Sequence, residues 1–223
     1  MTDKLVEQIT VTISIAAILL ALMFFLPAGT IYYWHAWVYL GLLFSSNILI
    51  VIYLLRHDRP LLERRLKIGE QVRPQKFITR IGSLAYFVLL LIPGLDFRFG
   101  WSSVPILVVI LADAVFLIGY YLLFLTLKEN SYASRVIEVE KGQKVISTGP
   151  YAVVRHPMYL TVLMTFGFTP LCLGSYWGMI MTVPLLLVLV FRILNEEKVL
   201  AETLPGYKEY LEKTKYRLIP TVW

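Results

Sequence analysis

Two clusters of polar residues in an otherwise apolar chain carry the groups that could do chemistry. The first is the stretch Arg155–Tyr159, which reads Arg-His-Pro-Met-Tyr, and the second holds Arg192 with the neighbouring glutamates Glu196 and Glu197. In a chain this apolar, a concentration of charged groups, a ring nitrogen and a phenol at the ends of apolar segments indicates a reaction site rather than a decorated surface. We therefore interpret the two clusters as parts of one reaction site at a membrane boundary.

Each cluster taken alone also has a purely structural interpretation. Pro157 after His156 suits the first position of a helix, where the next backbone N–H groups stay free and can hold a carboxylate. A capped helix with arginine and tyrosine at the lipid headgroups is the alternative. Arg192 and Glu196 share one face of a continuous helix and can pair. The alternative there is a helix-end salt bridge beside a solvated Glu197.

The composition defines the elements that must position these residues. The chain has 223 residues, of which 58% are hydrophobic and 16% charged, whereas soluble domains are about half apolar and a quarter charged. Apolar runs occupy residues 9–26, 36–55, 81–95, 104–127, 159–173 and 179–194. The sequence predicts an all-α polytopic integral membrane protein with about six hydrophobic helices and no Rossmann domain. The last two runs are short, and we expect a helical hairpin joined at residues 173–178.

The basic residues predict how the chain is oriented. The net charge is +6, and nearly every Lys and Arg falls on one side of the predicted spans, which should be the cytoplasm. Both termini are then cytoplasmic, in the plasma membrane of a prokaryote or the endoplasmic reticulum of a eukaryote. Orientation and anionic headgroups explain the basic excess, so we expect membrane lipids and no nucleic acid as partners.

The chain divides into two predicted regions. Residues 1–127 form N-terminal transmembrane helices with a basic amphipathic loop at residues 56–80. Residues 128–223 hold a cofactor-binding loop, in which residues 135–140 alternate like an extended segment, and a C-terminal amphipathic helix over residues 195–215 that Pro205 and Gly206 interrupt.

Few other polar residues lie inside the apolar runs. Asp113 has either a protonated structural role or a place along a substrate path, and Asn47 should hydrogen-bond between helices. His35 beside two tryptophans is typical of an interfacial aromatic belt. Cys172 is the single cysteine, so we predict no disulfide within the chain, and no metal-ligand spacing is present.

From about Lys128 to Pro220 the chain resembles the isoprenylcysteine carboxyl methyltransferase family, together with related phospholipid methyltransferases. The resemblance is carried by Asn130–Ser134, Gly149–Tyr151, Arg155–Tyr159, Arg192–Glu197, Gly206, Tyr207, Tyr210 and Leu218–Pro220. It implies S-adenosylmethionine as the cofactor, held without a Rossmann sheet at the cytoplasmic membrane boundary.

Carried over by position, the resemblance also implies roles for single residues. The cofactor contacts are Glu138, Gln143, Lys144, Val145, Ile146, Tyr151, His156, Pro157, Met158, Tyr159 and Glu196. Arg192 and Glu196 are the implied catalytic residues, and Arg192 faces the acceptor. Two departures stand out: Glu138 replaces an amide that the family tends to have, and Thr161 replaces a frequent glycine.

The resemblance predicts carboxyl O-methylation of a lipophilic, isoprenylcysteine-like acceptor. A carboxylate is ionised at neutral pH and needs no general base, and Arg192 could orient it. An amine acceptor would need His156 or Glu197 as a free base, as in the alternative, a phospholipid or amine N-methyltransferase. A sterol-reductase-like NADPH enzyme and a non-enzymatic transporter or scaffold are further alternatives. In a prokaryote the acceptor would be another membrane-soluble acid or amine.

Overall fold

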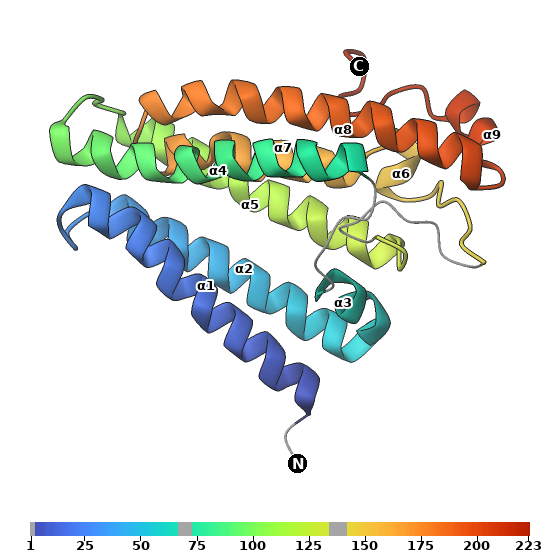
Figure 1. Cartoon of the computed structure of the whole chain (residues 1–223), viewed down its shortest axis with the longest axis horizontal. Helices are drawn as coiled ribbons and strands as arrows, with labels where there is room; N and C mark the ends of the chain where they lie inside the picture. The colour runs from blue at the N-terminus through green and yellow to red at the C-terminus, as the bar shows by residue number, and fades with distance from the viewer. Residues whose placement is uncertain (1–2, 67–72, 134–141) are drawn as a thin grey trace.

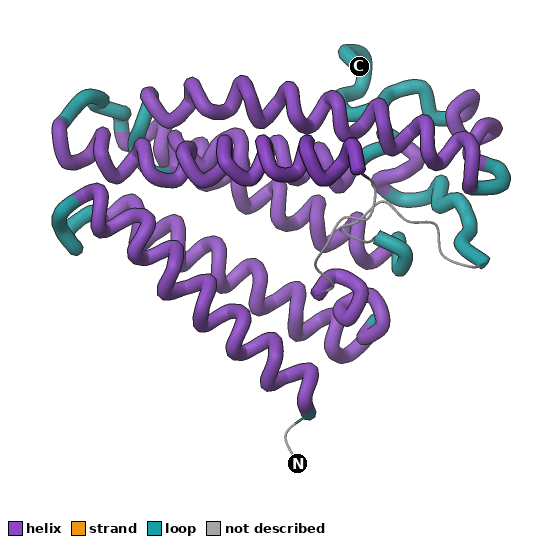
Figure 2. The backbone as a smooth tube through the Cα atoms, viewed as in Figure 1, coloured by secondary structure: helices purple, strands orange, loops and turns teal. Residues whose placement is uncertain are grey.

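The fold consists of helices and connecting loops. The computed structural model describes residues 3–66, 73–133 and 142–223, with residues 73–79 as backbone only. Every regular element in these ranges is a helix (Figure 2). Within the described residues, five helical segments are long and apolar enough to cross a membrane. The chain is therefore an all-α polytopic integral membrane protein, as predicted.

The spanning helices coincide with the predicted apolar runs. They are α1 (Lys4–Ala28), α2 (Trp34–His57), α4 (Arg73–Phe99), α5 (Ile106–Glu129) and α8 (Thr182–Thr203), the last preceded by the 3₁₀ turn η1 (Trp177–Met181). α1 and α2 form a slanted pair, and α4, α5 and α8 run along the other side of the molecule (Figure 1). Asn47 on α2 donates a hydrogen bond to Tyr120 on α5 at 2.8 Å, which confirms its predicted interhelical role.

The remaining apolar run forms α7 (Pro157–Cys172), which packs against α4, α5 and α8. At 16 residues it is about 24 Å long, shorter than the roughly 30 Å of a bilayer core. α7 turns back through residues 173–176 into η1 and α8, which gives the expected hairpin. Its first turn therefore lies beside the last turns of α8, where the two polar clusters meet.

Short helices gather at one end of the bundle, which we call the site end. They are α3 (Arg59–Leu66), α6 (Pro150–Val153) and α9 (Tyr207–Lys213) (Figure 1). α3 occupies part of the predicted basic loop, and its Leu61 and Leu62 are buried with Ile9, Leu54 and Leu127. The predicted extended segment at residues 135–140 lies outside the described residues.

The sixth apolar run continues without a break into the amphipathic segment that follows it. Together they form the single helix α8, which places Arg192 and Glu196 on one continuous helix. Residues 194–203 contain no glycine or proline, so nothing interrupts the backbone hydrogen bonds there. The helix ends before Pro205, and Gly206, with a φ of +83°, turns the chain into α9.

At the opposite end of the bundle, Asp96 is buried and only 1% of its surface is exposed. Its carboxylate accepts hydrogen bonds from the backbone N–H and the hydroxyl of Ser102, both at 2.6 Å, and from the hydroxyl of Ser175. Ser102 lies in the α4–α5 loop and Ser175 in the α7–η1 turn. One buried carboxylate therefore fixes both loops and, with them, the position of the α7–α8 hairpin.

Candidate functional site

The first polar cluster lies where α7 begins. His156 is the N-cap residue and Pro157 is in the first turn, which confirms the helix start that the sequence predicts. The His156 side chain makes no capping hydrogen bond; its Nε2 lies 3.2 Å from Oε1 of Glu197 on α8. Pro157 has no N–H, and the N–H groups of Tyr159 and Leu160 donate to the carbonyl of His156, so the backbone N–H that the first turn can offer to a ligand is that of Met158.

Glu197 is the centre of a buried ionic cluster, which we call the Glu197 cluster. Its Oε1 accepts a hydrogen bond from Nε of Arg155 at 2.6 Å, and its Oε2 accepts one from Nε of Arg217 at 2.8 Å. Glu197 and Arg155 are each 8% exposed and His156 is 4% exposed. The solvated Glu197 of the structural alternative is therefore wrong, because two guanidinium groups and an imidazole surround it.

The C-terminal segment completes this cluster. The backbone N–H of Arg155 donates to the carbonyl of Tyr216, and that of His156 donates to the carbonyl of Arg217, both at 2.9 Å. The Arg155 guanidinium also donates to the carbonyls of Thr214 and Lys215. No local sequence pattern predicts this pairing, because helix periodicity does not relate residues some 60 positions apart.

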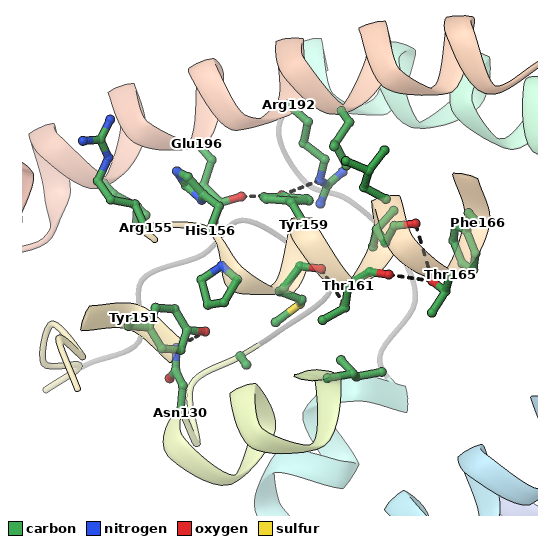
Figure 3. A pocket seen from close by; sticks show the side chains of 18 of the residues that line it. Asn130, Tyr151, Arg155, His156, Tyr159, Thr161, Thr165, Phe166, Arg192 and Glu196 are labelled. Carbon is green, nitrogen blue, oxygen red and sulfur yellow. Dashed lines mark hydrogen bonds between the residues drawn. The ribbon is translucent and has the colours of Figure 1, made fainter. Parts of the chain in front are cut away.

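The hydroxyl of Tyr159 also connects the two polar clusters, through residues of α8 that precede Glu197. Nε of Arg192 donates to the Tyr159 hydroxyl at 2.8 Å, and this hydroxyl donates to Oε2 of Glu196 (Figure 3). The expected common face of Arg192 and Glu196 is present, with Tyr159 between them. The geometry orders a cation, a phenol and a carboxylate in one row along α8.

Aromatic residues form the wall nearest the site end. Tyr151 in α6 receives a hydrogen bond from Asn130 on its hydroxyl and one from the Tyr210 hydroxyl on its carbonyl. Burial raises the pKa of Tyr151 and Tyr207 above the usual range and that of Tyr210 to about 12. These phenols therefore stay neutral near pH 7 and offer apolar ring faces with polar tips.

Gly149 sets the close approach of α6 to α5. It has a φ of +56°, and a Cβ atom there would lie 3.0 Å from the Glu129 carboxylate. The Thr148 hydroxyl donates to the same carboxylate, and Pro150 then starts α6. A glycine before a proline is needed here because the backbone turns in the left-handed region against a neighbouring side chain.

Residues of both polar clusters and of the aromatic wall line one cavity of about 690 Å³. This volume is ordinary for a small-molecule site. The predicted site residues that line it are Gln143, Lys144, Val145, Ile146, Tyr151, His156, Pro157, Met158, Tyr159, Arg192 and Glu196. Glu138 lies outside the described residues. Asp113, Cys172 and His35 are not part of the described lining, and the described residues hold no group of three potential metal ligands.

The cavity changes character along its length. At the site end it is lined by Tyr151, Tyr207, Tyr210 and the 143–146 loop, whereas further along α7 it passes between α4 and α8. The lining there includes Leu163, Leu185 and Leu186. A polar aromatic chamber therefore continues into an apolar one, and the Arg192–Tyr159–Glu196 row lies on the wall between them.

Comparison with protein-family models gives a match over residues 107–205, which covers α5 to α8. Together with the spanning helices, this match supports a membrane methyltransferase. The matched family is described as phospholipid methyltransferase, a relative of the isoprenylcysteine carboxyl methyltransferases. The predicted resemblance is thereby confirmed. A search of curated proteins finds no match for the chain.

Proposed function

We propose that the chain is an S-adenosylmethionine-dependent methyltransferase that methylates the carboxylate of a lipophilic, isoprenylcysteine-like acceptor. The observation that carries the proposal is the single cavity that joins a polar aromatic chamber to an apolar one. The first suits a soluble nucleoside-containing donor and the second a hydrocarbon tail. The basic residues at the site end favour a cytoplasmic location for the donor chamber and for both termini.

The residues of the donor chamber fit S-adenosylmethionine. The loop Gln143–Ile146 and Tyr151 offer apolar and aromatic surface for an adenine ring, and the first turn of α7 offers the backbone N–H of Met158 for a carboxylate. Glu196 supplies a negative charge for a cationic ligand. The cofactor, when bound, supplies an activated methyl group on a sulfonium. The protein chiefly has to align the two partners and exclude water.

Arg192 suits the acceptor end of the cavity. It lies on α8 one helical turn before Glu196, toward the apolar chamber, and Tyr159 fixes its Nε. A guanidinium can hold a carboxylate through parallel N–H donors. Tyr159 orients Arg192 and Glu196 together, so the acceptor and donor ends keep a fixed spacing. Residues 128–223 would then hold the donor site, with α4 and α5 lining the acceptor chamber.

The Glu197 cluster favours a carboxylate acceptor over an amine. Amine methylation needs a base, and the two groups considered for that role, His156 and Glu197, face one another. Glu197 is also held by Arg155 and Arg217, so it is poorly placed to take a proton. A carboxylate acceptor has no such requirement.

A phospholipid or amine N-methyltransferase is the second candidate, favoured by the description of the matched family. The two reactions differ in the bond that they form. Labelled methyl groups transferred from S-adenosylmethionine to extracted lipids or to a synthetic S-prenyl cysteine would be released by mild base from an ester and retained in an amine. Release supports the carboxylate acceptor, and retention in base establishes N-methylation instead.

The cofactor itself is tested by titration. Calorimetry of the purified, folded chain with S-adenosylmethionine and with its demethylated product should show saturable binding of both. His156→Ala and Glu196→Ala should weaken it, and Lys198→Ala, at an exposed position on α8, serves as the control. No binding heat above the detergent blank would remove the proposed cofactor.

A further inference from the structure

The apolar chamber has a polar patch at its deep end. Asn47 on α2 and Tyr120 on α5 line the cavity there, together with Tyr86 on α4. The Tyr86 ring lies 4.5 Å from the ring of Phe166, seven residues beyond Tyr159 on α7 (Figure 3). At 1.5 Å per residue, this places the patch about 10 Å along α7 from the Arg192–Tyr159–Glu196 row.

The hydrogen bonds of this patch define what it can offer. The Asn47 side-chain amide donates to the carbonyl of Leu43 and to the hydroxyl of Tyr120, both at 2.8 Å. These bonds use both amide N–H groups, so the group that Asn47 can offer to a ligand is its carbonyl oxygen. Tyr120 accepts in this pair, and its own O–H is the donor that it can present.

Buried residues next to the patch support its position. The Tyr39 hydroxyl lies 3.0 Å from the Thr169 hydroxyl. The Tyr39 ring packs on Phe116, which in turn packs on Tyr120. Tyr39 is 1% exposed, so it is closed to ligands and can only support the patch. Polar side chains on a cavity wall within spanning helices are expensive unless a partner satisfies them.

We propose that Asn47 and Tyr120 form a distal subsite for an oxygen atom in the tail of the acceptor, a hydroxyl or carbonyl oxygen about 10 Å from the group that receives the methyl. The inference rests on the proposed function and narrows its substrate class: the acceptor is a lipid with an oxygenated tail. A plain hydrocarbon tail would displace water from both polar groups without replacing its hydrogen bonds.

Binding of two matched product analogues tests the subsite without requiring turnover. Both are S-alkylated N-acetylcysteine methyl esters with the same 15-carbon tail, and one carries a hydroxyl at the corresponding depth. The wild-type chain in nanodiscs should bind the hydroxylated ester about five- to tenfold more tightly, the value of one or two good hydrogen bonds. Tyr120→Phe should bring this ratio close to one.

Tyr121→Phe is the matched control, because Tyr121 adjoins Tyr120 on α5, is 62% exposed and is not part of the described lining. Its ratio should stay at the wild-type value. Asn47→Leu, with the melting temperature measured alongside, repeats the test from α2 and should also lower the ratio. Equal binding of the two esters by the wild-type chain, or a ratio that survives Tyr120→Phe, would overturn the subsite.

The outcome for the subsite is separable from that for the reaction. If the hydroxylated ester binds through Tyr120 but the corresponding free acids are never methylated, the subsite stands and carboxyl methylation fails. If both acids are methylated at equal efficiency and Tyr120→Phe changes nothing, the reaction stands and the subsite fails.

Discussion

Arg217 donates a hydrogen bond from its Nε to Oε2 of Glu197 at 2.8 Å, and this contact connects the C-terminal segment to the last turns of α8. Arg155 binds the other oxygen of the same carboxylate. The N-terminus of α7, the end of α8 and residues 214–217 are therefore held by one side chain. We interpret Glu197 as a positioning residue for the donor chamber.

Glu197→Gln should destabilise the chain by about 3 kcal/mol, because it leaves the buried Arg155 and the half-buried Arg217 without their counter-charge. Thermal unfolding in detergent measures this change, and the Kd for S-adenosylmethionine should rise in the same variant as His156 loses its anchor. Glu202→Gln, at an exposed position on the same helix, should melt like the wild type. Unchanged melting of Glu197→Gln would mean that the cluster does not hold the segment in place.

Tyr159→Phe should lower kcat by about 10- to 100-fold, since a hydrogen bond to a charged group is worth about 1.5–3 kcal/mol and Tyr159 contacts both Arg192 and Glu196. The ring remains, so the melting temperature should change little. Steady-state rates with labelled S-adenosylmethionine measure the effect. Tyr32→Phe, in a far loop and 83% exposed, is the control, and equal rates for both variants would exclude Tyr159 from aligning the site.

Arg192→Ala should abolish detectable turnover while it leaves the calorimetric Kd for S-adenosylmethionine within about threefold of the wild-type value. Removal of the guanidinium takes away the group that orients the carboxylate. Arg192→Lys keeps the charge without the planar fork and should restore only part of the rate. A large loss of cofactor affinity in Arg192→Ala would instead assign Arg192 to the donor chamber.

Gly149→Ala should lower the melting temperature more than Gly100→Ala. Both glycines have a positive φ, at +56° and +65°, and an alanine at either costs about 1 kcal/mol of backbone strain. Only at Gly149 would the added Cβ also meet a neighbour, the carboxylate of Glu129, whereas nothing lies within 4 Å at Gly100. Equal melting temperatures would show that Glu129 moves aside without cost.

The sequence predicts the spanning helices and the α7 start because these depend on local signals: apolar runs of sufficient length and a proline in the first helical turn. Most predicted site residues line one cavity, because the motif residues lie at the ends of neighbouring helices. The roles of these residues remain predictions, and Glu138 lies outside the described residues.

What the sequence does not predict depends on contacts between distant segments. Glu197 looks like an exposed neighbour of Glu196 until the C-terminal segment places Arg217 beside it. The polar patch at Asn47 likewise requires four helices to be placed relative to one another. Periodicity within a single helix carries no information about either arrangement.

The uninterrupted course of α8 has a consequence for insertions and deletions. Arg192, Glu196 and Glu197 sit on one rigid helix whose earlier turns pack against α4 and α7. One residue added between Leu189 and Arg192 would rotate all three charged side chains by about 100° and advance them by about 1.5 Å. A substitution in this stretch changes the contacts of one side chain. A change of length would displace the side chains of the donor end and of the acceptor end together.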